Sequence, residues 1–163
     1  MIRDSYIRKK TTDEIEDVFK PKVHGAYYLD QFTQNLALRF FVCFSSLHSL
    51  GNPGQVDYAM SNAYLDGFTR ARNQQVSEGK RFGQSIALNW PYWENGGMQL
   101  SDIAIELMTS TKGSVPMPTH IGMEIMHYAL QLGIEQVFVD LGDHDKIIKQ
   151  HNISHFNAKL LEL

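Results

Sequence analysis

Residues 40–46 (FFVCFSS) and residues 51–62 (GNPGQVDYAMSN) decide the fold expected for this chain. The apolar run predicts a buried strand over about 38–44, and the serines after it are expected to enter a loop. The second stretch predicts a turn rich in glycine and proline, followed by a helix that begins close to Tyr58. Ligands of α/β sheets bind at the carboxyl ends of the strands, so hydroxyl groups at this edge indicate a site that polarises and protonates a carbonyl oxygen.

Helical and strand patterns alternate over the rest of the chain. A Thr-x-x-Glu capping box at Thr11 begins a helix that is expected to run to about Thr33, with a bend near Pro21. Strands that alternate with long helices imply a parallel sheet, so the predicted fold class is α/β, a Rossmann-like parallel sheet with flanking helices. The other predicted elements are a helix over 56–78, a strand over 84–89, a helix over 101–109, a helix over 119–133 and a strand over 136–141.

The sheet predicted in this way is incomplete. The strand over 38–44 is apolar on both faces, as strands inside a parallel sheet are, yet no earlier strand is predicted to pair with its edge. No Gly-x-Gly-x-x-Gly sequence follows any predicted strand, so the phosphate-binding half of a dinucleotide fold is missing. We therefore expect residues 1–145 to be a partial catalytic domain that lacks its N-terminal glycine-rich half, and residues 146–163 to be a tail or the start of a linker.

Composition excludes several classes of protein. With 163 residues, of which 43% are hydrophobic and 20% charged, the chain resembles one globular domain. The net charge is −3 and the one short basic cluster, residues 8–10, is expected to be a solvated turn, so no nucleic-acid partner is predicted. No signal-peptide pattern or membrane-spanning apolar stretch is found, and the single Cys43 cannot form a disulfide framework. These features predict a cytoplasmic protein with no membrane association.

Three stretches resemble the ketoreductase domain of modular polyketide synthases, a branch of the short-chain dehydrogenase/reductase superfamily. They are residues 41–46, 51–66 and 88–98, and residues 20–30 resemble the lysine-containing helix of the family. The resemblance implies a Rossmann-type catalytic domain that reduces a β-ketoacyl group with NADPH. It also implies a substrate held as a phosphopantetheine thioester on an acyl carrier protein, neighbouring synthase domains as partners, and a role in polyketide and hence antibiotic biosynthesis.

The resemblance assigns catalytic roles by position. Tyr58 matches the proton donor of the family, Lys22 its lysine, and Asn62 an asparagine that would orient Lys22 or an ordered water. Tyr58 and Asn62, at i and i+4, share one face of a helix. Reduction creates an alkoxide that must be protonated, and a nearby ammonium makes a phenol a better acid. A serine hydroxyl would hold the carbonyl oxygen: the pattern favours Ser46, with Ser45 as the alternative because the stretch to Tyr58 is one residue shorter than in relatives.

Further positions bear on stereochemistry and on ligand binding. The Ile2-Arg3-Asp4 stretch falls where B-type ketoreductases carry Leu-Asp-Asp, and Gln55 stands where A-type enzymes place tryptophan. Both features predict a B-type product with a D-configured hydroxyl, although Arg3 departs from the motif. Met60, in place of a proline, argues against the epimerising B subtype. The expected substrate-binding residues are Asp4, Gln55, Trp90 and Met98, and the expected cofactor-binding residues are Tyr58, Lys22 and Pro91.

Two other functions stay open at this point. A non-catalytic fragment or docking piece of a polyketide synthase is favoured by the missing glycine-rich loop. A stand-alone reductase of small carbonyl compounds is disfavoured by Asn62, because such enzymes place lysine there. Trp90 and Trp93 are interpreted equally well as core aromatic residues and as walls of a substrate entrance. The seven histidines lack the spacing of metal ligands, so no metal site is expected.

Overall fold

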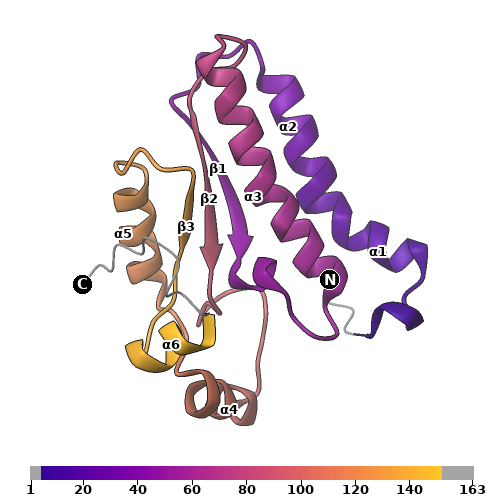
Figure 1. Cartoon of the computed structure of the whole chain (residues 1–163), viewed down its shortest axis with the longest axis vertical. Coiled ribbons are helices and arrows are strands. Elements are labelled where there is room, and N and C mark those ends of the chain that lie inside the picture. Colours follow the sequence, from indigo (N-terminus) through magenta and orange to yellow (C-terminus); the bar gives the residue numbers. More distant parts are fainter. Residues whose placement is uncertain (1–4, 152–163) are drawn as a thin grey trace. The chain divides into compact units, whose positions relative to one another are not determined.

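The computed structural model describes residues 5–151, in which a parallel sheet is flanked by helices (Figure 1). Within these residues the strand order is β1-β2-β3, and both neighbouring pairs are parallel, which confirms the predicted α/β class. The elements are η1 (Ile7–Lys9), α1 (Thr12–Phe19), η2 (Lys20–His24), α2 (Gly25–Thr33), β1 (Phe40–Ser46), η3 (Leu47–Leu50), α3 (Val56–Ser77), β2 (Gln84–Trp90), α4 (Asp102–Lys112), α5 (Thr119–Ala129), β3 (Gln136–Phe138) and α6 (His144–His151).

The chain divides into two compact units. The first comprises the chain up to Trp90 together with Met123–Val139, and it contains the sheet and helices α1 to α3. The second comprises Pro91–Gly122 and the chain from Asp140 onward. Helix α6 begins at His144, so the first residues of the expected tail are helical, while the division expected near residue 145 stays a prediction. Among the described helices, none has the length and apolar character needed to span a bilayer.

The predicted long N-terminal helix is present, with a local change of winding at Pro21. As the capping box predicts, Thr11 Oγ1 accepts a hydrogen bond from the Glu14 N–H at 3.3 Å, and Glu14 Oε2 accepts one from the Thr11 N–H at 3.0 Å. The π-helical turn η2 joins α1 to α2. Proline has no N–H to donate, so the regular helical pattern is interrupted there. Such turns often occur at functional sites, and this one contains Lys22.

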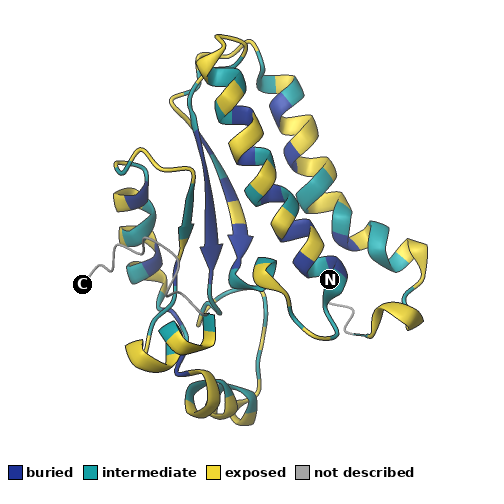
Figure 2. Cartoon of the chain, viewed as in Figure 1, coloured by how far each residue is buried: buried dark blue, intermediate teal, exposed yellow. Residues whose placement is uncertain are grey.

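The two faces of β1 differ in burial, whereas β2 is buried along nearly its whole length (Figure 2). Phe41 and Cys43 point to one face of β1 and pack in the core with side chains of α2 and α3. Burial raises the pKa of the Cys43 thiol to about 12, so this cysteine is an inert core group. On the opposite face Phe40 is 52% exposed and Phe44 is 49% exposed. In the described sheet β1 pairs with β2 alone, so its other edge is open.

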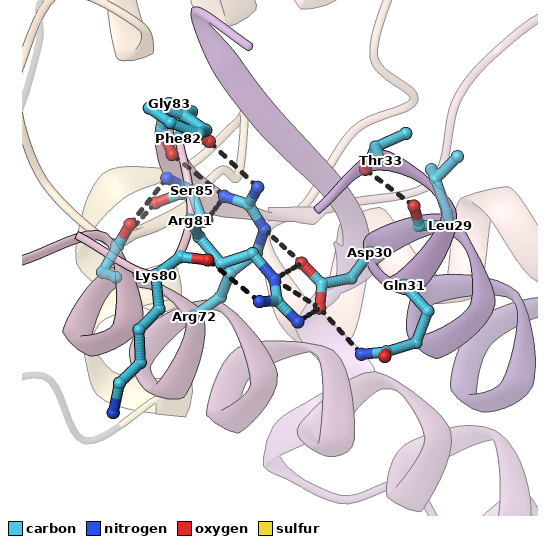
Figure 3. Close-up of polar contacts among 11 residues, drawn as sticks. Leu29, Asp30, Gln31, Thr33, Arg72, Lys80, Arg81, Phe82, Gly83 and Ser85 are labelled. Atoms are coloured by element: carbon cyan, nitrogen blue, oxygen red, sulfur yellow. Dashed lines mark hydrogen bonds and ion pairs between the residues drawn. The ribbon is translucent and has the colours of Figure 1, made fainter. Parts of the chain in front are cut away.

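A buried carboxylate connects α2 with α3 and with the segment that leads into β2 (Figure 3). Asp30 Oδ1 accepts hydrogen bonds from Arg72 Nε at 2.8 Å and from Arg81 Nε at 3.0 Å, and Asp30 Oδ2 accepts one from Arg81 Nη2 at 3.0 Å. The Arg72 side chain is 1% exposed, so its charge depends on this partner inside the unit. The remaining donors of Arg72 bind the carbonyl groups of Phe82 and Gly83 and the hydroxyl of Ser85, each at 2.9 Å.

The basic cluster at residues 8–10 is only partly a solvated turn. Arg8 and Lys9 are exposed, as expected. Lys10 differs, because its side chain is 0% exposed and its Nζ lies 2.7 Å from Asp57 Oδ2. The prediction is therefore wrong for Lys10, since its partner lies far away in the sequence, in the first turn of α3.

Candidate active site

The carboxyl ends of β1 and β2 and the first turns of α3 meet at one edge of the sheet. Parallel pairing places Ser45 beside Asn89, and Ser46 beside Trp90. Ser45 Oγ donates to the Asn62 carbonyl oxygen at 3.2 Å, which joins the end of β1 to α3. Both serines belong to β1 instead of the expected loop, because the strand continues to pair with β2 through Ser46. This is the edge where α/β sheets bind ligands.

The phenol of Tyr58 and the ammonium of Lys22 lie together at this edge. Tyr58 is half-buried in the first turn of α3, and Lys22 Nζ lies 5.5 Å from the centroid of its ring. Lys22 Nζ also donates to the Phe44 carbonyl oxygen at 2.7 Å. Burial lowers the pKa of Lys22, an effect that Cys43 and Asp66 oppose electrostatically. The structure thus brings together the two groups that the resemblance pairs.

The two serine hydroxyls differ in their hydrogen bonds. Ser45 Oγ donates to the Asn62 carbonyl and accepts from Asn89 Nδ2 at 3.0 Å, so its hydrogen is used inside the unit. Ser46 Oγ accepts from the His48 N–H at 3.2 Å. Within residues 5–151, no acceptor for the Ser46 hydroxyl hydrogen is present. Ser46 therefore keeps a donor for a bound carbonyl oxygen, whereas Ser45 does not.

Asn62 is fully buried one turn after Tyr58. Its Nδ2 donates to the Tyr58 carbonyl oxygen at 2.7 Å, while its Oδ1 has no hydrogen-bond partner among the described residues. Lys22 Nζ donates to the Phe44 carbonyl oxygen, and two of its three N–H donors remain for other partners, so the orientation of Lys22 by Asn62 stays a prediction. The alternative role, binding of an ordered water by Asn62, stays a prediction as well. An unpartnered buried acceptor is costly, so Oδ1 is a natural place for a donor to bind.

Asn89 is a further buried polar residue at this edge, and its pattern in the sequence predicts no role for it. It is fully buried and holds the end of β1 against η3 and α3. Its signal in the sequence was a lone amide in an apolar strand (SIALNW), but only the register shows that Ser45 is its neighbour. Asn89 Nδ2 lies 3.0 Å from Ser45 Oγ, 3.2 Å from the Ser46 carbonyl oxygen, 2.9 Å from Ser49 Oγ and 3.0 Å from Asp66 Oδ2.

Gln55 and Trp90 occupy structural positions next to these groups. Gln55 is the N-cap residue of α3, and its Oε1 accepts a hydrogen bond from Asn52 Nδ2 at 2.7 Å. Trp90 is buried at the end of β2, with its ring edge-to-face to Phe44 and the centroids 5.6 Å apart. This contact with Phe44 favours the interpretation of Trp90 as a core aromatic residue. Asp4 lies outside the described residues.

The remaining predicted ligand-binding residues, Pro91 and Met98, belong to the second unit. Trp93 is also part of this unit, where its indole packs against Gly122 so closely that a Cβ at Gly122 would lie 2.5 Å from the ring. Trp93 is thus a packing residue of the second unit. The structure brings Tyr58, Lys22, Ser46 and Asn62 together in the first unit.

Comparisons with known proteins identify the family of this chain. A family model described as KR domain matches residues 1–95, which is more than half of the chain. The chain belongs to the ketoreductase (KR) domain family. Within this family, the ketoreductase chain is 39% identical over 146 residues to polyketide synthase PksN of Bacillus subtilis (strain 168), an alignment that covers 89% of this chain and 3% of PksN.

Solved ketoreductases have the same fold. A ketoreductase domain from the bacillaene assembly line has a TM-score of 0.87 and 39% identity, and covers 91% of this chain. An N-terminal ketoreductase from the macrolactin assembly line has a TM-score of 0.77 and 32% identity, and covers 92% of this chain. The present ketoreductase chain spans 36% of the first of these solved chains and 28% of the second.

Proposed function

We propose that this ketoreductase chain reduces a β-ketoacyl thioester on an acyl carrier protein to the β-hydroxyacyl thioester during polyketide biosynthesis. The observation that carries the proposal is the grouping of the Tyr58 phenol, the Lys22 ammonium and the Ser46 hydroxyl at one edge of the sheet. Membership of the ketoreductase family and the polyketide synthase relatives support the substrate class.

Each group has a distinct task in this reaction. The Ser46 hydroxyl donates to the ketone oxygen and fixes its position. As charge develops on that oxygen, the Tyr58 hydroxyl transfers its proton to it, so the ketone becomes an alcohol and Tyr58 becomes a phenolate. The Lys22 ammonium stabilises this phenolate through its opposite charge. In the proposed reaction Asn62 Oδ1, which has no partner among the described residues, accepts a hydrogen bond from a water that returns the proton to Tyr58.

The residues present fit a nicotinamide cofactor. Its sugar hydroxyl groups need hydrogen-bond partners, and Tyr58 offers a hydroxyl and Lys22 an ammonium, with Lys22 Nζ 5.5 Å from the centroid of the Tyr58 ring. We propose that these two residues hold NADPH; Pro91, which belongs to the second unit, stays a prediction from the family resemblance. When bound, NADPH supplies the hydride that adds to the ketone carbon.

We further propose that an N-terminal half with a glycine-rich turn completes the domain at the open edge of β1. The unpaired edge of β1 in the described sheet and the greater length of the solved ketoreductase chains support this view. The proposed product is B-type, with a D-configured hydroxyl, on the basis of Asp4 and Gln55.

The two serines provide a paired prediction. Replacing Ser46 with alanine removes the donor to the ketone oxygen and should lower kcat by about 10²-fold. Replacing Ser45 with alanine breaks two buried hydrogen bonds and should instead lower the free energy of unfolding by about 1–3 kcal/mol. Steady-state kinetics and urea unfolding of both variants distinguish these effects. Equal losses of kcat in the two variants would contradict the assignment of Ser46.

The lowered pKa of Lys22 predicts the alkaline limit of activity. The ammonium is the charged form, so it is lost when the pH rises above a pKa that lies below the ordinary 10.5. Activity should therefore fall at a lower pH than an ordinary lysine would give. In Lys22→Arg the guanidinium stays protonated to a pH of about 12 or more, so the alkaline limb should move to higher pH even though the rate decreases. A limb that is unchanged in Lys22→Arg would argue against Lys22.

The proposed function is tested in a chimera, in which this chain replaces the matching segment of the bacillaene ketoreductase domain. Two substrates are compared: a β-ketoacyl thioester on an acyl carrier protein, and a free ketone without the carrier. The proposal predicts carrier-dependent formation of the D-configured alcohol, measured by chiral chromatography. Preferential reduction of free ketones would favour a stand-alone reductase instead, and an L-configured product would refute the B-type assignment.

A further inference from the structure

A buried ion pair lies directly beside the proposed proton donor. Lys10 Nζ binds Asp57 Oδ2 at 2.7 Å, and the two side chains are 0% and 3% exposed. Asp57 precedes Tyr58 in the first turn of α3. An ion pair in the interior loses the hydration of both charges, so stability alone is weak evidence for its purpose.

Asp57 fixes the start of α3 through both of its oxygens. While Oδ2 binds Lys10, Oδ1 accepts a hydrogen bond from the Tyr58 backbone N–H at 3.0 Å. The first N–H groups of a helix have no partner within the helix and need one from elsewhere. Gln55, the N-cap residue, makes no capping hydrogen bond through its side chain, which accepts from Asn52 instead. Asp57 instead accepts from a backbone N–H of the first turn, and this N–H belongs to Tyr58, the proposed proton donor.

The segment that carries Lys10 is itself attached at both ends. The Ser5 N–H donates to the Gly54 carbonyl oxygen at 2.9 Å, in the loop before α3. On the other side, the capping box of Thr11 and Glu14 fixes the start of α1 directly after Lys10. The backbone is thus anchored on both sides of Lys10, so the Lys10 ammonium contacts Asp57 from a fixed position.

We propose that Lys10 is a positioning residue for Tyr58, acting through Asp57 on the first turn of α3. This inference rests on the proposed function, because it assumes that the position of Tyr58 matters for reduction. The structural effect does not depend on that assumption: without the Lys10 ammonium, the Asp57 carboxylate and the Tyr58 ring move, while the rest of the unit keeps its packing. A loss of positioning of this kind lowers kcat and leaves the Michaelis constants nearly unchanged.

The test compares Lys10→Met with Lys9→Met, a matched control on the exposed neighbouring residue. Each variant is made in the chain with ¹³C-labelled tyrosine rings and in the chimera. In Lys10→Met we expect the Tyr58 ring resonance, assigned with Tyr58→Phe, to shift while the other six of the seven tyrosines do not. We also expect kcat in the chimera to fall at least about tenfold, with both KM values changed by less than about twofold, and Lys10→Arg to recover most of the loss. Lys9→Met should change neither readout.

If Lys10→Met does not fold, the double variant K10M/D57N takes its place, because it removes both charges of the pair. The Tyr58 resonance and kcat are then measured on the double variant. An unmoved Tyr58 resonance, or an equal shift of all tyrosine resonances, would overturn the proposal, because Lys10 would then be irrelevant to Tyr58 or important only for the whole fold. An unchanged kcat together with a shifted Tyr58 resonance would overturn it as well. An inactive parent chimera would count against the proposed function, while the resonance shift would still decide whether Lys10 positions Tyr58.

Discussion

Replacing Tyr58 with phenylalanine is expected to reduce ketoreductase turnover in the chimera by a factor of about 10²–10⁴, the usual contribution of a positioned general acid. The substitution removes one hydroxyl and keeps the ring, which lies edge-to-face to His48 with the centroids 6.0 Å apart, and 5.5 Å from Lys22 Nζ. Packing should therefore persist, so the loss is expected in kcat. Steady-state kinetics with a β-ketoacyl thioester measure kcat, and a fluorescence titration with NADPH measures the affinity for the cofactor separately.

A matched control for Tyr58 is Tyr28, an exposed tyrosine of α2. Tyr28→Phe removes the same atom elsewhere on the surface of the first unit and should leave turnover unchanged. If Tyr58→Phe retains full turnover, or if the two variants lose activity equally, the catalytic assignment of Tyr58 fails.

Replacing Asp30 with asparagine should have the largest effect on stability. Two guanidinium groups share this carboxylate, and one of them, on Arg72, is buried, so the variant leaves a buried charge without its counter-ion. Breaking a buried ion pair on one side costs about 3–5 kcal/mol. We expect the free energy of unfolding, measured by urea denaturation, to fall by about this amount.

Asp17 offers the matched control for Asp30. Its carboxylate lies 2.9 Å from Lys20 Nζ at an exposed i,i+3 position, and surface pairs of this kind contribute only about 0–1 kcal/mol. Asp17→Asn should therefore hardly move the unfolding midpoint. Equal changes in the two variants would show that the buried cluster of Asp30, Arg72 and Arg81 does not stabilise the unit beyond a surface pair.

Local patterns in the sequence predicted the secondary structure well where neighbouring residues alone determine a helix or a strand. The capping box at Thr11 and the apolar periodicity after it predicted the first helix, and the bend expected near Pro21 is realised as the π-helical turn. The alternation of strands and helices predicted the parallel sheet. The grouping of Tyr58 with Lys22 required the family resemblance, because 36 positions along the chain separate Lys22 from Tyr58 in the sequence.

Contacts between elements remote in the sequence could not be predicted from local patterns. Lys10 looked like a solvated lysine, because its carboxylate partner is 47 positions away on α3. The role of Asn89 depends on the register that places it beside Ser45. The choice between Ser45 and Ser46 depends on which hydroxyl hydrogen is already used, and that is a property of the folded hydrogen-bond network.

The most direct test of this account is a single-turnover reduction by the chimera, with NADPH in excess and a β-ketoacyl thioester on an acyl carrier protein. The bacillaene parent domain serves as the reference, and NADPH binding is measured on the same samples. We predict formation of the β-hydroxyacyl thioester at a rate within about tenfold of the parent, since the same groups would perform the chemistry. A folded chimera that binds NADPH but forms no alcohol would contradict the account and favour a non-catalytic role in the synthase.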